Sequence, residues 1–438
     1  NSPAVISVNS STQRLVKMLR LLLVAGSVAV ALAGRSPHAD FIDELVASKP
    51  SARYSNHIIE DAKLDVPGLV AKYGYPIESH EVITPDGYIL TMHRIPHGRD
   101  RNNKPVRNKP VVFLMHGMMS SSADYLVIGP GNAIGYVLAE EGYDVWLANA
   151  RGNFYSRRHT TLDPNDRSNQ NFWRFSWDEI GNIDLPACLS YIERVTGQTR
   201  YHYIGHSQGG TSFLVLNSLH PEYNKKFISF QAMAPAAFFE HNSHSIYSNL
   251  APYIHILEPA AFALGRGEIF GSREFIEWFA LNMCTVGSIF EPMCSSIVVS
   301  ATSDYFNQTM IPLFLGHAPA GASIRQFTHY GQGINHHTFR RFDHNPITNR
   351  LIYGSRIPPD YDLNLVTAPT YIYYSVNDAS TNYKDVRILV DRLPNVKGSF
   401  LMDSPTFDHL DFIWGSGVRH RLYNKMIGLM RNAERNAF

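Results

Sequence analysis

Short apolar runs alternate with segments of helical spacing along most of the chain. The apolar runs occupy residues 110–115, 143–148, 201–204 and 227–235. The segments of helical spacing occupy residues 132–141, 177–196 and 211–216. Continuous apolar runs are typical of parallel strands covered on both faces. Strands that alternate with helices predict a mostly parallel sheet with right-handed crossovers.

Two further regions complete this pattern. Before the first parallel strand, His80–Thr84 and Tyr88–His93 flank Pro85-Asp86-Gly87, which predicts two strands joined by a tight turn. The alternation stops between residues 239 and 346, where we expect helices and no buried strand. It resumes with strands at 369–376 and 398–402, a helix near 384–392 and a C-terminal helix.

This order of elements predicts an α/β fold with an inserted, mainly helical cap. We expect residues 35–238 and 347–438 to form the core and residues 239–346 to form the cap. The insertion is expected over the carboxyl edge of the sheet, because open α/β sheets bind their ligands at that edge. The cap is rich in large apolar residues, which suit either a lid that meets a lipid surface or the core of the cap itself.

The N-terminal region has the features of a secretory signal peptide. Basic residues between positions 14 and 20 precede the apolar run Leu21–Ala33, which ends in Ala31-Leu32-Ala33, a small-residue cleavage signature. A membrane-spanning helix needs about 20 apolar residues, so an uncleaved anchor is the less favoured alternative. Met18 would make a compact start, in which case residues 1–17 are upstream sequence. We therefore expect residues 1–34 to be removed and no transmembrane anchor to remain.

Composition excludes several classes of protein. Of the 438 residues, 44% are apolar and 18% charged, which is ordinary for a globular enzyme and wrong for a disordered chain. The formal net charge is +1, and neither a basic run nor an acidic tail occurs, so we expect no nucleic-acid partner. No cysteine or histidine spacing predicts a metal site, and we expect no cofactor.

Three cysteines remain to be assigned. In an exported protein, an odd number favours one disulfide and one free thiol. Cys284 and Cys294 close a short loop and are the expected pair. Cys188 lies in a segment of helical spacing, where a small buried apolar residue is more common than a nucleophile.

Gly205-His206-Ser207-Gln208-Gly209 carries the clearest chemical signal in the chain. It lies between a predicted strand and a predicted helix, which is the setting of the nucleophile elbow in α/β-hydrolases. The turn is so sharp that side chains at Gly205 and Gly209 would collide with the backbone, and only Ser207 projects. We expect Ser207 to be a catalytic nucleophile.

A serine nucleophile needs a general base that is oriented by a carboxylate. In this fold class the order along the chain is serine, acid, histidine. Asp378 follows the strand at 369–376, and His409 precedes the final helix, so we predict that they are the acid and the base. The competing carboxyls are Asp403, Asp408 and Asp411, and the competing histidine is His420. The remaining histidines considered, which we interpret as structural, are His202, His206, His241, His244, His336 and His337.

Acyl transfer also needs two backbone amides that stabilise the developing oxyanion. One is expected from Gln208, directly after the nucleophile. The other is expected from Met118, because His116-Gly117 follows the strand at 110–115 and is similar to the HG motif of lipases and esterases. Both donors are main-chain groups.

These residues and several longer motifs give the chain a resemblance to the acid lipase family, which includes gastric lipase, lysosomal acid lipase and insect homologues. The resemblance runs from Tyr73 to the C-terminus. Its motifs are VITPDGYIL, PVVFLMHG, GYDVWLANARGN, FWRFSWDEI, HYIGHSQGG, GHAPAGAS and FDHLDFIWG. Carried over residue by residue, it implies Ser207, Asp378 and His409 as the triad and Met118 and Gln208 as the oxyanion donors.

The resemblance also implies a helical cap, a cap disulfide between Cys284 and Cys294, and N-glycosylation at Asn307. Asn307-Gln308-Thr309 is an acceptor sequence for such a glycan. The chain departs modestly from the family: Gly210 stands where a threonine is frequent, and Met118-Met119 replaces a leucine pair. Neither change removes a catalytic group.

The function that follows is a secreted or lysosomal lipase that hydrolyses esters of long-chain fatty acids at a lipid–water interface. Two alternatives remain open. One is a carboxylesterase for small soluble esters, which the length of the cap disfavours. The other is a non-catalytic lipid-binding protein on the same scaffold, which the presence of all three triad candidates disfavours.

Overall fold

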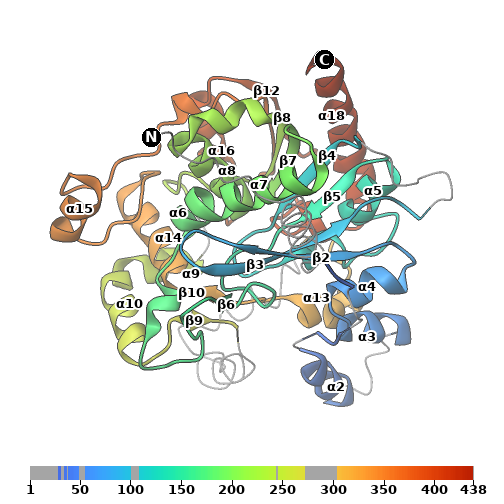
Figure 1. The fold of residues 1–438 in the computed structure, drawn as a ribbon, viewed down its shortest axis with the longest axis horizontal. Coiled ribbons are helices and arrows are strands. Elements are labelled where there is room, and N and C mark those ends of the chain that lie inside the picture. Colours follow the sequence, from blue (N-terminus) through green and yellow to red (C-terminus); the bar gives the residue numbers. More distant parts are fainter. Residues whose placement is uncertain are drawn as a thin grey trace, which may run out of the picture.

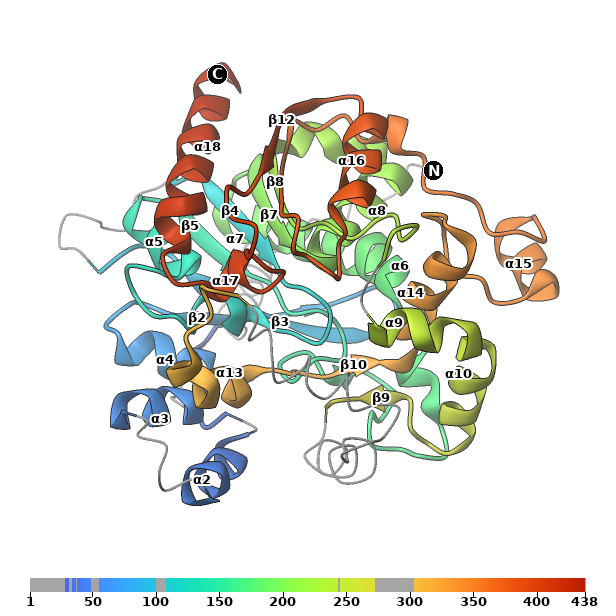
Figure 2. The ribbon, with the colours of Figure 1, turned by 180° about the vertical axis from the view of Figure 1, so that it is seen from behind.

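A twisted sheet runs through the molecule, and helices pack on both of its faces (Figure 1). The computed structural model describes residues 28–30, 34–36, 38–48, 55–99, 108–242, 245–271 and 303–437. The view from behind shows the same layers, with α18 at one end of the molecule and α15 at the other (Figure 2). The predicted α/β class is therefore confirmed.

The sheet has a parallel part and an antiparallel part. Its strands are β1 (Val28–Val30), β2 (Glu78–Ile83), β3 (Tyr88–Ile95), β4 (Val111–Met115), β5 (Asp144–Leu147), β6 (Arg158–His159), β7 (Tyr201–His206), β8 (Phe227–Met233), β11 (Thr370–Tyr374) and β12 (Val396–Leu401). They lie in the order β1-β2-β3-β5-β4-β7-β8-β11-β12, and β6 pairs with β3. The strands from β5 to β12 in this order run parallel, whereas β1, β2 and β3 are antiparallel. The carboxyl ends of β4, β7, β8 and β11 consequently meet at one edge.

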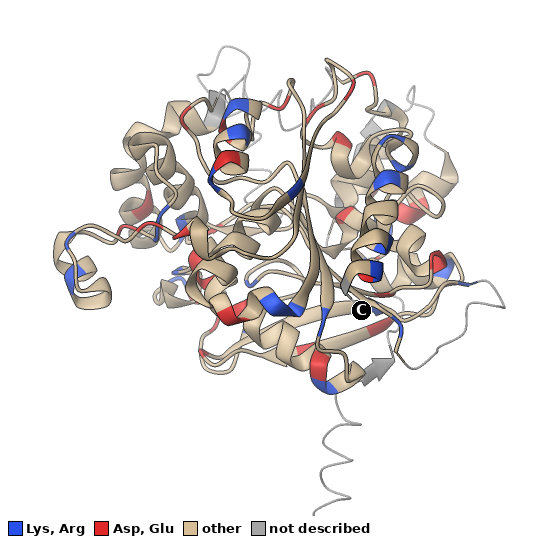
Figure 3. Cartoon of the chain, turned by 90° about the horizontal axis from the view of Figure 1, so that it is seen from above, with Lys and Arg blue, Asp and Glu red and all other residues tan. Residues whose placement is uncertain are grey.

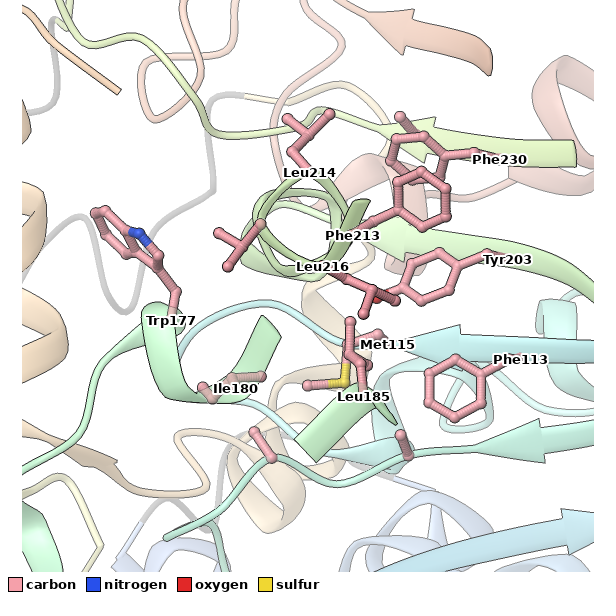
Figure 4. Close-up of a cluster of buried hydrophobic side chains, with 14 of the residues drawn as sticks. Phe113, Met115, Trp177, Ile180, Leu185, Tyr203, Phe213, Leu214, Leu216 and Phe230 are labelled. Carbon is pink, nitrogen blue, oxygen red and sulfur yellow. The ribbon is translucent and has the colours of Figure 1, made fainter. Parts of the chain in front are cut away.

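Helices cover both faces of this sheet. They are α2 (Ala39–Ser48), α3 (Asn56–Lys63), α4 (Val66–Lys72), α5 (Ile134–Glu140), α6 (Trp177–Glu179), α7 (Leu185–Thr196), α8 (Gln208–Leu219), α16 (Tyr383–Arg392), α17 (Asp411–Trp414) and α18 (Asn424–Ala437). Shorter helical turns are η1 (Ser122–Tyr125), η2 (Gln170–Trp173), η4 (Pro221–Lys226), η7 (Leu363–Leu365) and η8 (Arg419–Tyr423). Figure 4 shows how side chains of α8, such as Phe213 and Leu216, pack towards Phe113 and Tyr203 on the strands. Because β4, β7 and β8 are buried along their whole length, they position the residues at their ends rigidly.

The segment predicted as a helix over 177–196 is helical throughout, with one π-helical turn inside it. Between α6 and α7 lies a π-helical turn, η3 (Ile180–Asp184), in which Leu185 N–H bonds to the Ile180 carbonyl. Pro186 has no N–H to donate to the carbonyl four residues before it, which accounts for the wider turn. A Cβ at Gly181 would lie 2.5 Å from Cβ of Val215, so this turn packs closely on α8.

Most of the elements described between residues 239 and 346 are helices, as expected. Its described elements are α9 (Ser245–Leu250), η5 (Ala251–Tyr253), α10 (Ile254–Ala263), β9 (Glu268–Ile269), η6 (Gln308–Met310), α13 (Ile311–His317), β10 (Ala322–Ser323) and α14 (Ile324–His336), and α15 (Pro346–Tyr353) follows. The expectation of no buried strand was wrong, because β9 and β10 form an antiparallel ribbon with buried Ile269 and Ala322. Two-residue strands are too short to leave a periodic pattern in the sequence.

Some predictions concern residues outside the described ranges. Cys284 and Cys294 lie there, as does the cleavage signature Ala31-Leu32-Ala33. Val28–Val30 of the predicted signal peptide pairs with β2 as the edge strand β1. Cys188 is buried and carries a free thiol, as expected. Within the described ranges, no helix combines the length and apolarity needed to cross a membrane.

Candidate active site

The turn between β7 and α8 holds Ser207 in an unusual backbone conformation. Its φ is 52° and its ψ is −119°, a region that serine rarely adopts. A Cβ at Gly205 would lie 2.7 Å from the Gly209 carbonyl carbon, and a Cβ at Gly209 would lie 1.9 Å from the Met115 carbonyl oxygen. Both glycines are therefore required by close backbone contacts. From Tyr201 to Ser218, Ser207 is the one residue that is not buried.

Asp378 and His409 form a close pair beyond the strands that carry them. Nδ1 of His409 lies 2.7 Å from Oδ2 of Asp378. Because a carboxylate only accepts, Nδ1 donates this bond, and Nε2 is left as the basic nitrogen of the neutral ring. Asp378 is itself buried and accepts bonds from the N–H and hydroxyl groups of Thr381 and the N–H of Ser380. These bonds fix the carboxylate of Asp378, and the carboxylate in turn fixes the orientation of the His409 ring.

Each member of this pair shifts the pKa of the other. Burial is the largest single influence and lowers the pKa of His409. The charge and hydrogen bond of Asp378, together with the charges of Asp408 and Asp124, outweigh burial, so the pKa is raised overall. Burial would raise the pKa of Asp378, yet the charge and hydrogen bond of His409 hold that pKa below its ordinary value. The pair therefore favours a charged imidazolium beside a carboxylate, which is the state that a general base reaches after taking a proton.

His206 joins this pair to the nucleophile turn. Its Nε2 lies 3.0 Å from the backbone oxygen of His409 and donates to it, and the two rings have centroids 4.7 Å apart. Because His206 directly precedes Ser207, this bond holds the loop of His409 beside the nucleophile turn. Burial lowers the pKa of His206 to about 3, and the nearby His409 charge adds to that shift. A neutral His206 is thus compatible with a proton on His409.

The competing carboxyls face other partners. Asp403 lies on the surface near Arg421, and Asp411 accepts a bond from Ser303 and another from the N–H of Asp408. Asp408 accepts the backbone N–H of His409. His420 lies in the helical turn η8, as its sequence position predicted. Of the residues that the sequence proposed as acid and base, the structure brings Asp378 and His409 together.

The loop after β4 lies against the nucleophile. A Cβ at Gly117 would be only 3.2 Å from Cβ of Ser207. Nδ1 of His116 lies 2.7 Å from the Gly117 carbonyl oxygen, and the N–H of Ala150 donates to Nε2 of His116 over 3.0 Å. Nε2 must accept and Nδ1 must donate, which defines a single neutral tautomer. Burial lowers the pKa of His116 to about 4, so this tautomer persists in mildly acidic solution.

The His116 bond determines which way the next amide points. The Gly117 carbonyl and the Met118 N–H belong to one peptide group, and in a trans peptide they point in opposite directions. Because the carbonyl points to His116, the Met118 N–H points away from that ring. Sequence reasoning used His116 only as part of a motif and missed this contact. The signal that could have found it is a histidine at the end of a buried strand, directly before the glycine.

The same loop is held from two other sides. Tyr125 OH donates to the Met115 carbonyl, and Ala320 N–H donates to the Met119 carbonyl over 2.7 Å. Met118 and Met119 also pack against a small apolar cluster that contains Ile269 and Phe270. The ribbon of β9 and β10 therefore contacts the loop that carries the predicted oxyanion donor.

Gln208 is the first residue of α8, so its N–H has no acceptor within the helix. Its side chain is turned towards α14, where Nε2 donates to Oε1 of Gln326 over 2.6 Å. The helix dipole favours negative charge in front of this terminus. The two predicted oxyanion donors come from different segments, Gln208 from the start of α8 and Met118 from the loop after β4.

Two of the histidines interpreted as structural have polar partners in the structure. His202 bonds to Ser229 and Glu434, and His241 bonds to Asp385. His336 and His337 lie at the end of α14, and His244 lies outside the described ranges. Across the described part of the chain, no group of three or more His, Cys, Asp or Glu side chains is arranged to hold a metal ion.

Comparison with known proteins places these features in context. A family model described as "Partial alpha/beta-hydrolase lipase region" matches residues 66–129, and one described as "alpha/beta hydrolase fold" matches residues 110–248. The chain is 41% identical to Lipase 1 of Drosophila melanogaster over 85% of this chain and 81% of that protein. It is 34% identical to gastric triacylglycerol lipase of Bos taurus over 84% and 92%. It is 33% identical to lysosomal acid lipase/cholesteryl ester hydrolase of Homo sapiens over 85% and 92%.

Proposed function

Because the chain belongs to the family of α/β-hydrolase lipases that includes gastric and lysosomal acid lipases, we propose that Ser207, His409 and Asp378 form its catalytic triad. The chain is a serine ester hydrolase of the lipase type. The observation that carries the residue assignment is the bond between buried Asp378 and half-buried His409, joined through His206 to the turn that presents Ser207.

In the first half of the reaction, the Ser207 hydroxyl attacks the ester carbonyl carbon. Nε2 of His409 takes the hydroxyl proton as the new C–O bond forms, and Asp378 stabilises the resulting imidazolium. The tetrahedral intermediate then collapses and breaks the bond to the alcohol. His409 returns its proton to the departing alcohol oxygen, which leaves an acyl-Ser207 ester.

In the second half, water replaces the alcohol. His409 takes a proton from water as the oxygen attacks the acyl carbonyl, and the second tetrahedral intermediate releases the fatty acid. The proton returns to Ser207. Both intermediates carry an oxyanion, and we assign its stabilisation to the N–H groups of Gln208 and Met118. His116 is a positioning residue in this scheme, because it holds the Gly117 carbonyl and thereby directs the Met118 amide.

The substrate class that we propose is the ester of a long-chain fatty acid, either triacylglycerol or sterol ester. The relatives named gastric triacylglycerol lipase and lysosomal acid lipase/cholesteryl ester hydrolase support this class. Residues 239–346 would act as a cap over a core formed by residues 35–238 and 347–438. The contact of the β9–β10 ribbon with Met118 supports a cap that borders the acyl-binding region.

We also propose export of the chain to the extracellular space or, alternatively, to lysosomes. The signal-peptide pattern supports this route, and so does the position of Asn307. Asn307 is exposed, and its side-chain oxygen accepts bonds from the N–H and hydroxyl of Thr309. An exposed acceptor asparagine within a turn is accessible to glycan transfer. A disulfide between Cys284 and Cys294 would fit the same oxidising route.

The test of this proposal is fatty-acid release from emulsified triacylglycerol by the full chain and by Ser207→Ala. We expect the substitution to lower kcat by on the order of 10⁶-fold, the cost of removing the nucleophile of a serine hydrolase. Ser212→Ala is a matched control, because Ser212 lies on the same helix and bonds only to the Gln208 carbonyl. Comparable fatty-acid release by Ser207→Ala would remove the proposed mechanism. Hydrolysis of short soluble esters without activity on the emulsion would favour the carboxylesterase alternative.

A further inference from the structure

Helix α15 carries its apolar side chains on the outside. Ile347 is 78% exposed and Leu351 is 82% exposed, and Ile352 and the following Ile357 are also exposed. Figures 1 and 2 both show this helix projecting from one end of the long axis of the molecule. A surface helix normally turns such residues towards the core. Helix α15 therefore turns its apolar side chains to solvent instead of to the core.

Hydrogen bonds from Asn349 and Tyr353 anchor α15. Asn349 is the buried residue of the helix, and its Nδ2 donates to Oδ1 of Asp343 and to the Arg356 carbonyl. Its Oδ1 accepts the N–H of His344, and Tyr353 OH donates to the Phe342 carbonyl. These bonds orient the helix so that Asn349 points inwards. The exposure of the aliphatic residues is thus a consequence of how the helix is anchored.

Both ends of the helix are capped. Oδ1 of Asn345 accepts the N–H groups of Ile347 and Thr348, and Gly354 ends the helix in the left-handed region with φ 74°. Caps of this kind typically contribute about 1 kcal/mol each to helix stability. An eight-residue helix with two caps and a buried asparagine is a defined element. The exposed apolar face of α15 is therefore part of the ordered fold.

The projecting segment is also basic. Residues 345–357 contain Arg350 and Arg356, both exposed, and no Asp or Glu. Figure 3 shows basic positions at this projecting end. Exposed apolar residues on a globular protein mark contact sites, and aliphatic residues combined with Arg are typical of helices that lie in a lipid interface. A negatively charged lipid surface can contact both the exposed aliphatic side chains and the arginines.

A second exposed apolar set lies at the same end of the molecule. Helix α10 and its flanks expose Tyr253, Ile256 and Leu264, and Figures 1 and 2 both place α10 towards the same end of the long axis as α15. Arg325 of α14 pairs with Glu258 of α10 over 2.9 Å and also lies over the ring of Phe342. Arg325 of α14 thus contacts α10 and the segment that precedes α15.

Helix α14 also reaches the proposed active site, because its Gln326 accepts the side-chain bond from Gln208. Helix α14 therefore contacts both α10 and the nucleophile turn. By contrast, one projecting helix of eight residues offers little of the roughly 800 Å² per partner that stable protein interfaces need. A few aliphatic side chains are sufficient to enter a lipid surface.

We propose that α15 is a docking helix for an anionic lipid–water surface, in which Ile347 and Leu351 insert and Arg350 and Arg356 contact negative groups. This inference rests on the proposed lipase function and adds the surface through which the enzyme reaches its substrate. Hydrolysis releases fatty acids, and their carboxylates add negative charge to the same surface. Docking through α15 is thereby strengthened as the reaction proceeds.

The test uses the full chain and two double variants, Ile347→Ser with Leu351→Ser and Arg350→Gln with Arg356→Gln. Binding is measured by flotation with vesicles of phosphatidylcholine plus phosphatidylglycerol and with vesicles of phosphatidylcholine alone. We expect the serine variant to lose on the order of 10-fold or more of its binding to the mixed vesicles. The glutamine variant should lose binding to the mixed vesicles at low salt and little at high salt.

Ile83→Ser is the matched control, because Ile83 is 63% exposed on β2 and lies outside α10 and α15. It should bind vesicles as the unchanged chain does, and the melting temperature of every variant should stay unchanged. Unaltered vesicle binding by the serine variant would overturn the proposal. A dimer that the serine variant converts to a monomer, with vesicle binding retained, would assign α15 to a second copy instead.

Two readouts separate this inference from the proposed function. Hydrolysis of a short soluble ester and labelling of Ser207 by an organophosphonate report on the triad without a lipid surface. We expect the α15 variants to hydrolyse the soluble ester and to be labelled at Ser207 as the unchanged chain is. Their activity on the emulsion should fall in proportion to the vesicle binding that they lose. If the unchanged chain neither hydrolyses the soluble ester nor is labelled at Ser207, the proposed function is wrong. If the α15 variants keep their activity on the emulsion, the docking role is wrong.

Discussion

The carboxyl edge of the sheet and helix α15 use buried polar groups in opposite ways. At the sheet edge, Asp378 is buried and each of its bonds serves to orient His409, a side chain that the chemistry needs. In α15, Asn349 is buried and its bonds orient aliphatic side chains towards solvent. A buried polar group that is fully bonded gives a unique geometry in both cases.

The two regions are therefore suited to different contacts. The sheet edge presents one hydroxyl, Ser207, among buried neighbours, which suits a single reacting bond. Helix α15 presents several apolar side chains and two arginines, which suits a broad surface with no defined atoms. The predicted effects of substitution should differ accordingly: large at the sheet edge on every substrate, and modest at α15 on particulate substrate alone.

The largest effect in this comparison is expected for Asp378→Asn. The amide can present its own N–H₂ to Nδ1 of His409 and favour the wrong tautomer, so we expect kcat for a soluble ester to fall by on the order of 10⁴-fold. Asp403→Asn is the control, since Asp403 lies on the surface beside Arg421. Steady-state kinetics of the two variants check the prediction. Equal losses in both would show that the carboxyl at 378 has no special role.

The same variant should change the pH dependence. Only neutral His409 can accept the Ser207 proton, so activity falls as the pH drops through the raised pKa of His409. Removing the Asp378 charge removes the main cause of that raised pKa, although Asp408 and Asp124 also raise it. The acid limb of the residual kcat/KM profile should therefore move to lower pH. A limb that stayed in place would mean that another group controls it.

A smaller effect is expected at His116. His116→Leu removes the donor that fixes the Gly117 carbonyl, and a misdirected Met118 amide should cost on the order of 100-fold in kcat. KM for a soluble ester should change little, because the amide acts on the oxyanion and not on the bound ester. His116→Gln keeps a donor and should retain more activity than His116→Leu. Equal losses, or a loss confined to KM, would contradict the positioning role.

Much of the fold followed from the sequence because its signals are local. The buried strands β4, β5, β7 and β8 are continuous apolar runs, and the turn at Gly205–Gly209 has a distinctive pattern. Asp378 and His409 were located by chain order, and the structure brings them together. The π-helical turn at 180–184 was not predicted, because Pro186, to which we attribute it, would also be well tolerated at the start of a helix.

Other features depended on contacts between distant parts of the chain. The ribbon of β9 and β10 pairs residues about fifty positions apart, and the strands are too short to be periodic. The bonds of His116 to Ala150 and of His206 to His409 arise only when loops from separate strands meet at one edge. The outward face of α15 was also missed, because its apolar spacing is that of an ordinary buried helix until Asn349 is seen to be the inward residue.

The most direct test of the central claim is the rate at which an organophosphonate labels Ser207 in the unchanged chain, in His409→Gln and in His420→Gln. Labelling requires an activated serine but no lipid surface. The triad predicts rapid labelling of Ser207 in the unchanged chain and in His420→Gln, with labelling of His409→Gln slowed by on the order of 10³-fold or more. Equal labelling of the two histidine variants, or labelling at another serine, would contradict the account.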